Sequence, residues 1–430
     1  MPSTISTRAL WLACLLPVSA WSQGDPVTAE LRQLKQELAR LQDRIERLER
    51  QQAQATDSGA SPEVVATRKA APLTDATAAP LTDAPKPAKP NVKMAGRIHS
   101  DVYAFDEDQL PLSGGTELRR ARLEWHADLG DWGADVVYEL AGDGGADGLR
   151  DVLVRRQVGD TRWFLGQFKP LRSMAELTSS NNLVVPERPF LSASGVFSGR
   201  QHQQGLGFLT DHGRGGYGLT VFILRDQATA RNDGWGAAGR ASFTGWNSPG
   251  EVLHLGAWYS LERGASDTPS LRARYEYAGR RGPRPTLAST TAGAAEAEVD
   301  AWAIEAAWQH GGWLLQSELG RAGFADEQGR SHLRSGYLQA SYLFGGGYRA
   351  YKSAAGTFGG PKLDRPAWEL TARYDRVEGE PAVGDLSSTV IGLNYHYNDH
   401  LRWLLSYTLG DSDVDDDQTR QIALRTQFTF

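Results

Sequence analysis

The chain ends in Gln421-Ile422-Ala423-Leu424-Arg425-Thr426-Gln427-Phe428-Thr429-Phe430, a segment in which apolar and polar side chains alternate. A period of two is typical of a β-strand with two different faces. One face carries Ile422, Leu424, Thr426, Phe428 and Phe430, and the other carries Gln421, Ala423, Arg425, Gln427 and Thr429. An apolar face that ends in an aromatic residue suits a strand whose outside is lipid. The last strand of a soluble sandwich is the alternative that these residues alone leave open.

The same alternation recurs throughout residues 93–430. Ile98 and Val102 oppose Arg97, His99 and Asp101, and Trp368, Leu370 and Tyr374 oppose Glu369, Thr371 and Arg373. A closed barrel with lipid outside and water inside explains this long run of alternating strands better than a soluble sandwich does. At roughly 10 residues per strand, with short turns and long loops in alternation, we expect an antiparallel transmembrane β-barrel of about 16 strands around an aqueous channel.

The first twenty residues are typical of a signal peptide. Arg8 precedes an apolar run over residues 9–18, and Val18-Ser19-Ala20 supplies small residues before an expected cut at Trp21. The run is too short to span a membrane. Because the single cysteine, Cys14, lies inside this run, the mature chain is expected to have no disulfide and no thiol chemistry.

Residues 21–52 are interpreted as a periplasmic coiled-coil segment. Leu31, Leu34, Leu38, Leu41, Ile45 and Leu48 follow one another at alternating spacings of three and four, which is the apolar seam of a heptad repeat. The interhelical pairs Glu30–Lys35 and Arg44–Glu49 favour parallel self-association, and a single solvated helix is the alternative. Residues 53–92 form an Ala/Pro-rich linker with too little apolar surface to order itself. The barrel domain is expected over residues 93–430.

Composition excludes several classes of function. The 46 basic and 52 acidic residues leave a formal charge of −6, which offers no case for a nucleic-acid partner. The nine histidines are scattered, and no HExxH motif, glycine-rich phosphate loop or cysteine cluster occurs. We therefore expect no catalytic residue, no metal site and no cofactor. The 13 Trp, 14 Tyr and 13 Phe suit the aromatic girdles of a membrane barrel.

Three guanidinium groups are concentrated in Glu117-Leu118-Arg119-Arg120-Ala121-Arg122. Strand geometry points Arg120 and Arg122 into the lumen beside Arg97 of the preceding strand, while Arg119 projects toward a rim or bend. Guanidinium groups match phosphate or carboxylate oxygens and stay charged at any relevant pH, so such a lumen would concentrate anions. The alternative is a structural network in which these arginines pair with Asp101, Glu124 and Asp151.

Residues 169–202 are irregular and lie between strands expected at Trp163–Phe168 and Gln203–Phe208. So long an irregular segment between two strands is unusual unless it is functional. Folded into the pore, it would narrow the channel and offer Lys169, Ser179, Ser180 and Arg188 as donors. An external loop over the mouth is the alternative.

From about Gly96 to Phe430 the chain resembles the phosphate-selective porin family (porin O/P). The resemblance rests on the order and spacing of several short motifs: Arg119-Arg120-Ala121-Arg122, Gly166-Gln167-Phe168-Lys169-Pro170, Glu176-Leu177-Thr178-Ser179-Ser180, Glu187-Arg188, Tyr348-Arg349-Ala350-Tyr351, Trp368-Glu369-Leu370-Thr371-Ala372-Arg373-Tyr374 and Gly392-Leu393-Asn394-Tyr395.

This resemblance implies a homotrimer of 16-stranded barrels in the outer membrane of a Gram-negative bacterium, with the third extracellular loop folded inward. It implies a diffusion channel for phosphate, polyphosphate or other small anions. The implied anion-binding positions are Arg97, Arg119, Arg120, Ser179, Ser180 and Arg188, with Asp151 beside them. Two positions depart from the family pattern, since Arg122 stands where an aromatic residue is expected and Glu176 where a basic residue is expected.

Three other functions remain open from the sequence. A general or sugar-selective porin would need aromatic residues along its lumen, whereas the clear Trp and Tyr residues fall on the lipid face. An outer-membrane enzyme would need inward catalytic residues, and no Ser/His/Asp set lies on adjacent strands. A structural tether would use the barrel only to anchor the heptad segment.

Overall fold

The computed structural model describes residues 89–106, 108–142, 148–225, 232–265, 269–294 and 296–430. The expected signal peptide and coiled-coil segment, and nearly all of the expected linker, lie outside these ranges. The chain divides into two units, residues 1–82 and 83–430, and only the second contains described residues. In the described ranges, no helix has both the length and the apolar character needed to cross a membrane.

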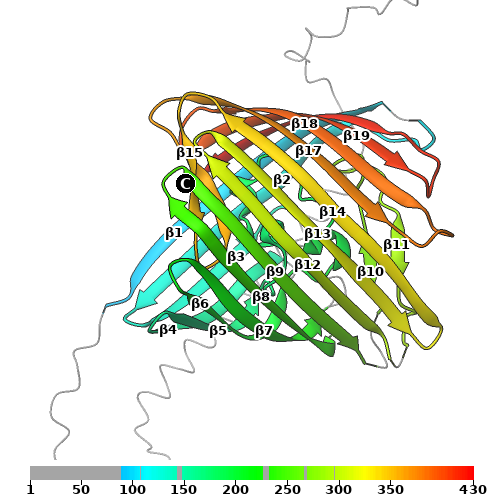
Figure 1. Cartoon of the computed structure of the whole chain (residues 1–430), viewed down its shortest axis with the longest axis horizontal. Coiled ribbons are helices and arrows are strands. Elements are labelled where there is room, and N and C mark those ends of the chain that lie inside the picture. The colour runs from blue at the N-terminus through cyan, green and yellow to red at the C-terminus, as the bar shows by residue number, and fades with distance from the viewer. Residues whose placement is uncertain (1–88, 107, 143–147, 226–231, 266–268, 295) are drawn as a thin grey trace, which may run out of the picture. The chain divides into compact units, whose positions relative to one another are not determined.

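Sixteen antiparallel strands close into a barrel (Figure 1), which confirms the predicted fold. They are β1 (Asn91–Asp106), β2 (Gly115–Leu129), β3 (Trp132–Glu139), β4 (Leu149–Val158), β5 (Thr161–Phe168), β6 (Gln203–Asp211), β7 (Gly215–Arg225), β8 (Asn232–Ser248), β9 (Glu251–Gly264), β12 (Glu298–His310), β13 (Trp313–Asp326), β14 (Gly329–Leu343), β17 (Ala367–Glu378), β18 (Asp385–His396), β19 (Leu401–Ser412) and β20 (Arg420–Thr429). Two small hairpins stand apart, β10 (Arg272–Arg274) with β11 (Thr286–Ser289) and β15 (Tyr348–Lys352) with β16 (Thr357–Lys362).

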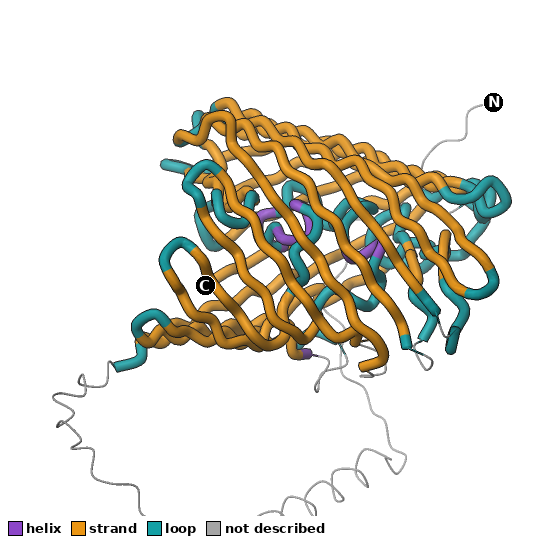
Figure 2. The backbone as a smooth tube through the Cα atoms, turned by 60° about the horizontal axis from the view of Figure 1, so that its bottom comes forward, coloured by secondary structure: helices purple, strands orange, loops and turns teal. Residues whose placement is uncertain are grey.

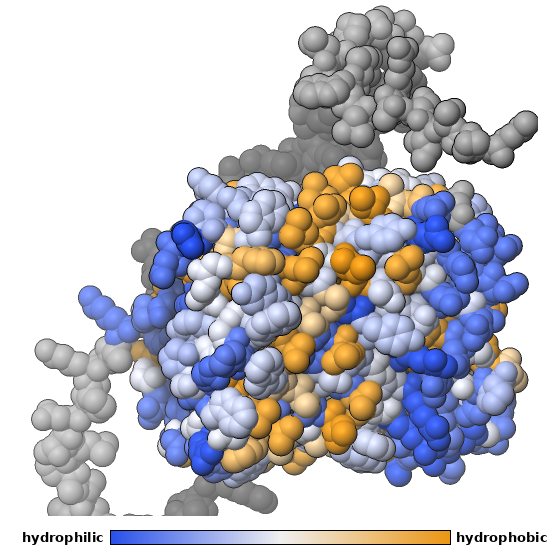
Figure 3. Space-filling model, turned by 45° about the horizontal axis from the view of Figure 1, so that its top comes forward, coloured by the Kyte–Doolittle hydropathy of each residue, from blue (hydrophilic) through white to orange (hydrophobic). Residues whose placement is uncertain are grey.

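The barrel buries its charges and exposes its apolar residues. Along β17, Trp368 is 49% exposed, whereas its neighbour Glu369 is fully buried. In the last strand Phe428 is 43% exposed and Arg425 only 2%. This pattern is the reverse of a soluble protein and suits lipid outside and a polar lumen. The outer surface accordingly shows apolar patches over the strands and hydrophilic side chains at one end (Figure 3).

The first and last strands close the ring. Asp101 of β1 and Arg425 of β20 are register partners, and Arg425 donates from Nε and Nη2 to the two carboxylate oxygens of Asp101, each over 2.7 Å. The charged face of the last strand therefore points inward as predicted. Its arginine serves the closure of the barrel, because pairing of the terminal strands removes the exposed sheet edges.

Connections are short at the barrel end that holds Asn91 and Phe430, with the exception of residues 344–366, and several are long at the other end. Short turns face the periplasm and long loops the exterior in barrels of this kind. The β10–β11 hairpin thus belongs to an extracellular loop, and the β15–β16 hairpin to the periplasmic end.

Residues 169–202, hereafter the inner loop, contain α2 (Met174–Leu177), the 3₁₀ turn η2 (Ser180–Asn182) and α3 (Ala193–Val196). These short helical segments lie inside the ring of strands (Figure 2). The inner loop therefore occupies the lumen, as the first of the two sequence interpretations expects, instead of covering the mouth.

The β15–β16 hairpin also reaches into the lumen, from the periplasmic end. Arg349 donates from Nη2 to both carboxylate oxygens of Glu369, over 2.6 and 2.7 Å, and the Tyr351 hydroxyl lies 2.7 Å from Nδ1 of His254. Arg240 donates to the carbonyls of Ala355 and Gly356 over 2.6 and 3.0 Å. Side chains of the barrel wall thus hold this hairpin in place.

Candidate functional site: the pore constriction

The inner loop begins at an acidic anchor on β13. Glu318 accepts hydrogen bonds from the Ser173 hydroxyl over 3.2 Å and from the backbone N–H groups of Met174 and Ala175 over 3.2 and 2.8 Å. Ser173 has φ 57°, in the left-handed region, so its backbone conformation is sustained by contacts to the wall. A fully buried carboxylate therefore satisfies the N–H groups at the start of α2.

The same loop is then held by the wall at β17 and β18. Asp375 accepts from the N–H of Phe190 over 3.2 Å, and Asn394 donates to the carbonyl of Val184 over 2.8 Å. Arg373 donates to the carbonyl of Glu187 over 2.6 Å. Because these anchors lie on β17 and β18, the loop packs on that side of the lumen and leaves space beside β2–β5.

Arg97 connects β1 to the turn of the inner loop. Its Nη1 donates to the hydroxyls of Ser179 and Ser180, each over 3.1 Å, and its Nη2 pairs with Glu124. The hydroxyl groups of both serines therefore lie beside the Arg97 guanidinium at the constriction. Ser180 is buried, and Ser179 also caps η2 by accepting from the N–H of Asn181.

A β-bulge directs adjacent arginines to the same region. The register of β1 and β2 shifts between His99 and Ser100, so that His99 pairs with Arg120 and Ser100 with Leu118. Arg119 is the extra residue, and such an insertion redirects a side chain without ending the strand. Arg119 donates from Nε and Nη2 to the two carboxylate oxygens of Glu187, each over 2.9 Å. The expected bend at Arg119 is therefore this bulge.

Arg120 and Arg122 share one carboxylate. Arg122 Nε donates to Oε2 of Glu139 over 2.8 Å, while Nη1 of Arg120 lies 3.7 Å from the same oxygen. The other oxygen of Glu139 accepts from the N–H of Ala121. Among the described residues, the buried Nε of Arg120 has no hydrogen-bond partner. Arg120 is thus the arginine of this group whose charge is least compensated.

The inner loop contributes two cations. Lys169 Nζ lies 2.6 Å from Oε1 of Glu176 and donates to the Glu176 carbonyl over 2.9 Å. Arg188 donates to the carbonyls of Ala175 and Thr178 over 3.1 and 2.6 Å, and its Nε lies 3.5 Å from Oε2 of Glu176. Glu176, the departure from the family pattern, therefore partly neutralises both cations.

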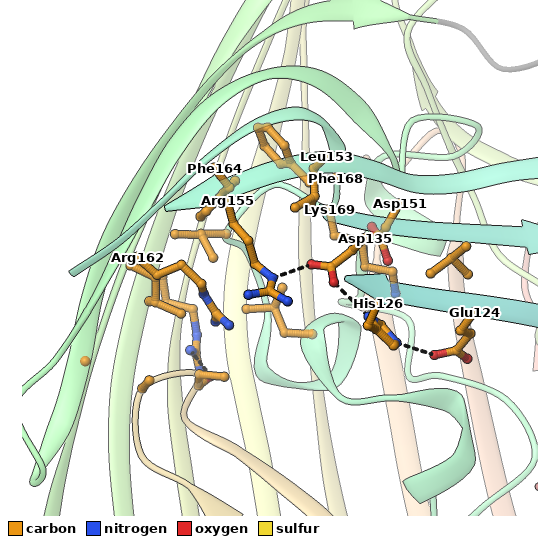
Figure 4. A pocket seen from close by; sticks show the side chains of 18 residues that line it. Glu124, His126, Asp135, Asp151, Leu153, Arg155, Arg162, Phe164, Phe168 and Lys169 are labelled. Atoms are coloured by element: carbon orange, nitrogen blue, oxygen red, sulfur yellow. Dashed lines mark hydrogen bonds and ion pairs between the residues drawn. The ribbon is translucent and has the colours of Figure 1, made fainter. Parts of the chain in front are cut away.

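Asp151 lies in a lumen cavity of about 310 Å³ beside β2–β5 (Figure 4). Its side chain is 37% exposed and lies 3.9 Å from Nε2 of His202. Along this wall, hydrogen bonds or ion pairs connect Arg155 to Asp135, Asp135 to His126, and His126 to Glu124. Of the pairs considered from the sequence, the structure shows Arg97 with Glu124. Asp101 pairs instead with Arg425 of the last strand, and Asp151 faces the cavity.

The sequence reasoning missed the arginines of the β10–β11 loop. Arg280 and Arg281 pair with Glu117 over 2.7 and 2.9 Å, and Arg284 donates to the hydroxyl of Ser198 in the inner loop over 2.9 Å. Alternation in Arg272-Ala273-Arg274 and the pair Arg280-Arg281 were available signals. Their approach to the lumen depends on how the loop folds.

A closed 16-stranded barrel with an inward loop and charged lumen defines an outer-membrane porin. A model of the family described as phosphate-selective porin O and P matches residues 92–430, and the chain belongs to this family. It is therefore a channel of the Gram-negative outer membrane and not an enzyme.

Comparisons with individual known proteins agree with the porin fold. An uncharacterised protein of Caulobacter vibrioides is 26% identical over 93% of this chain and 88% of its own length. An anion-selective porin from Comamonas acidovorans is 13% identical, covers 80% of this chain and all of its own, and has a TM-score of 0.55. OmpT of Vibrio cholerae, 9% identical over 79% of this chain and 98% of its own, has a TM-score of 0.52. At these identities the two structures share the fold.

Proposed function

We propose that the chain forms a water-filled, anion-selective diffusion channel for phosphate or polyphosphate. The proposal rests mainly on the incomplete pairing of Arg120 in the lumen. Among the described residues its only ion-pair partner is Glu139, at 3.7 Å, and Arg122 shares that carboxylate. A guanidinium held in this way has donors available for a passing oxyanion. Phosphate-selective family membership and the cationic excess described below support the choice of cargo.

Among the residues proposed to bind the anion and the carboxylates nearest to them, five cations face four carboxylates. The cations are Arg97, Arg120, Arg122, Lys169 and Arg188, and the carboxylates are Glu124, Glu139, Asp151 and Glu176. A lumen with this balance attracts anions and repels cations, although the whole chain is acidic. The proposed anion-binding set therefore keeps the residues expected from the sequence, with Arg119 holding the loop through Glu187.

Cationic groups extend the path toward the periplasm. Arg162 is exposed in the lumen cavity and has no ion pair among the described residues. A second cavity of about 360 Å³ at the periplasmic end is lined by Lys352, Lys362 and Arg402. Arg402 there donates to Gln427 over 2.9 Å, and its Nε and Nη1 have no partner in the described part of the chain. An anion leaving the constriction would meet further donors.

The lumen does not favour the sugar-porin alternative. Three aromatic residues on the inner side, Trp258, Tyr337 and Tyr277, are nearly fully buried, so these three offer no stacking surface to a passing ring. The Tyr337 and Tyr277 hydroxyls donate to Glu318 and Asp417 over 3.0 and 2.6 Å. These aromatics therefore support the wall and loops.

Reversal potentials of single channels in planar bilayers under a salt gradient test this function, with phosphate added against chloride current. We expect anion selectivity and a chloride conductance that phosphate reduces at low concentration. Cation selectivity would contradict the anion channel. Anion selectivity without an effect of phosphate would contradict the proposed cargo.

We also propose a homotrimer in which residues 21–52 form a parallel coiled coil. Support comes from the heptad seam and from the short strands β3 and β5, each of eight residues, where a membrane strand needs about 9–11. Packing against another barrel would cover such a short wall. A V. cholerae OmpT structure is described as a trimer form. Deleting residues 21–52 should lower the temperature at which the trimer dissociates in detergent; an unchanged temperature would contradict the coiled coil.

A further inference from the structure

Two arginines face the lipid side of the barrel opposite one another. Arg321 of β13 and Arg334 of β14 are direct register partners, and both are exposed on the outer face, where Leu319 and Leu338 are also exposed. Like charges directly opposite each other on neighbouring strands destabilise a sheet. The pair therefore requires an anion or a large dielectric to offset the repulsion.

The neighbouring outward arginines form ion pairs with carboxylates, whereas Arg321 and Arg334 form none with the residues that the structure describes. Arg263 pairs with Glu298 over 2.9 Å, Arg330 with Asp300 over 2.9 Å, and Arg376 with Asp385 over 3.0 Å. No ion pair or hydrogen bond involves the Arg321 or Arg334 side chain among the described residues. Glu378 lies opposite Arg334 in the register, but its ion pair is with Nε of Arg376 over 3.2 Å.

The pair lies at the level of the outer membrane interface. Arg321 is the register partner of Trp302, which is in turn the partner of Tyr259, and both aromatic residues are exposed on the outside. Trp and Tyr concentrate at the headgroup level of membrane proteins. On β13, Trp313 marks the aromatic level at the other end of the strand. Arg321 follows it by eight residue steps, which on a strand tilted by about 40° span roughly 20 Å of height.

An apolar groove of about 730 Å³ runs beside the two arginines. Trp302, Ile304, Leu319, Leu338 and Tyr374 line it together with both arginines. Gly336 also lines the groove, and the Leu319 side chain packs over it, since an added Cβ would lie 2.3 Å from that side chain. A headgroup-level cationic pair beside an apolar groove matches one ligand chemistry, a phosphate attached to acyl chains.

We propose that Arg321 and Arg334 bind a phosphate of an anionic glycolipid in the extracellular leaflet, with an acyl chain in the adjoining groove. Two guanidinium groups can share the oxygens of one phosphate through charge-assisted hydrogen bonds. The charge of the lipid offsets the repulsion between the arginines. This site is on the outside of the barrel and is independent of transport through the lumen.

Native mass spectrometry of the full chain in detergent, with bis-phosphorylated lipid A as the probe, tests the proposal. We expect a retained lipid on the natural protein and a loss of at least about tenfold in affinity for the double variant Arg321→Gln with Arg334→Gln. The matched control is Arg263→Gln with Arg330→Gln, which removes two outward arginines of the same rim that already have carboxylate partners. Its affinity should change by less than about threefold.

Further arms separate the possible outcomes. Lipid A without its phosphates should bind the natural protein weakly, with an affinity no higher than that of phosphorylated lipid A for the double variant. Inorganic phosphate should not displace the bound lipid. Equal binding of both lipids, or full binding by the double variant, would overturn the proposal. Dissociation of the double variant into monomers would instead assign the surface to another protein copy. The conductance of the double variant should be unchanged, which keeps this test distinct from that of the channel.

Discussion

Arg119 and Glu187 form a two-point ion pair that joins the barrel wall to the inner loop, with Nε and Nη2 each 2.9 Å from a carboxylate oxygen. Glu187 also accepts from Nη2 of Arg425 over 2.7 Å. Although burial opposes it, Arg119 and then Arg425 hold the pKa of Glu187 well below its usual range. Glu187 thus contacts two wall arginines, of which Arg425 is also paired with Asp101. Arg120 is left as the neighbouring arginine with donors available.

Replacing Glu187 with Gln should loosen the inner loop, because two guanidinium groups would lose their shared anion. Since the side chains of the pair are 18% and 25% exposed, we expect a cost of only about 1–2 kcal/mol. Single-channel recordings should show more frequent current fluctuations. Equally steady current in Glu187→Gln would contradict the anchoring role.

Arg120→Ala should reduce anion selectivity more than Arg119→Ala does, because Arg120 keeps donors free while Arg119 is occupied by Glu187. We expect the chloride-over-potassium permeability ratio to fall by several-fold, about 1 kcal/mol. Reversal potentials in a salt gradient measure this ratio. A larger effect of Arg119→Ala would mean that the selectivity depends on loop position and not on the free guanidinium.

Glu318→Ala should release the start of the inner loop, since the N–H groups of Met174 and Ala175 and the Ser173 hydroxyl lose their common acceptor. Leaving buried donors unpaired costs about 1–3 kcal/mol. We expect a larger and noisier conductance. Gln316→Ala, on the same inward face of β13, is the comparison, because Gln316 contacts the loop only weakly through the Met174 sulphur at 3.8 Å.

Lys169 should make selectivity depend modestly on pH. Burial, followed by the positive charge of Arg188, lowers its pKa to about 7, against the opposing influence of Glu176. A lysine is charged below its pKa, so anion selectivity should be greater at pH 6 than at pH 8. The arginines remain charged at both values, and the channel should stay anion-selective. Reversal potentials at the two pH values measure this difference. Lys169→Met should abolish the difference in selectivity between pH 6 and pH 8. A difference that persists in this variant would assign the pH dependence to another group.

The alternation of residues along the chain was sufficient to predict the barrel. Apolar and charged faces repeat with a period of two from β1 to β20, and this local property depends only on which neighbours in the sequence share a face. The inward direction of Arg97, Arg120 and Arg122 follows from the same rule. Strand number followed from length, because the spacing of strands and turns in such barrels is regular.

Partners across the lumen could not be predicted in the same way. Arg119 opposite Glu187, Glu318 at the start of α2 and Arg425 beside Asp101 join positions far apart in the sequence. The bend expected at Arg119 says nothing about its partner, because an interrupted alternation shows where a strand is irregular and not what the redirected side chain contacts. The arginines of the β10–β11 loop likewise depend on a fold that has no periodic signal.

The sequence by itself determined that this protein is a membrane barrel with a charged interior, because successive side chains of a strand point to opposite faces of the sheet. Only the tertiary structure decided which charges are used up in ion pairs and which remain available. Closure brings β1 beside β20, and the inner loop crosses to the wall of β13–β18. These long-range contacts neutralise Arg119 and Arg425, leave Arg120 incompletely paired, and set Arg321 against Arg334 on the outside.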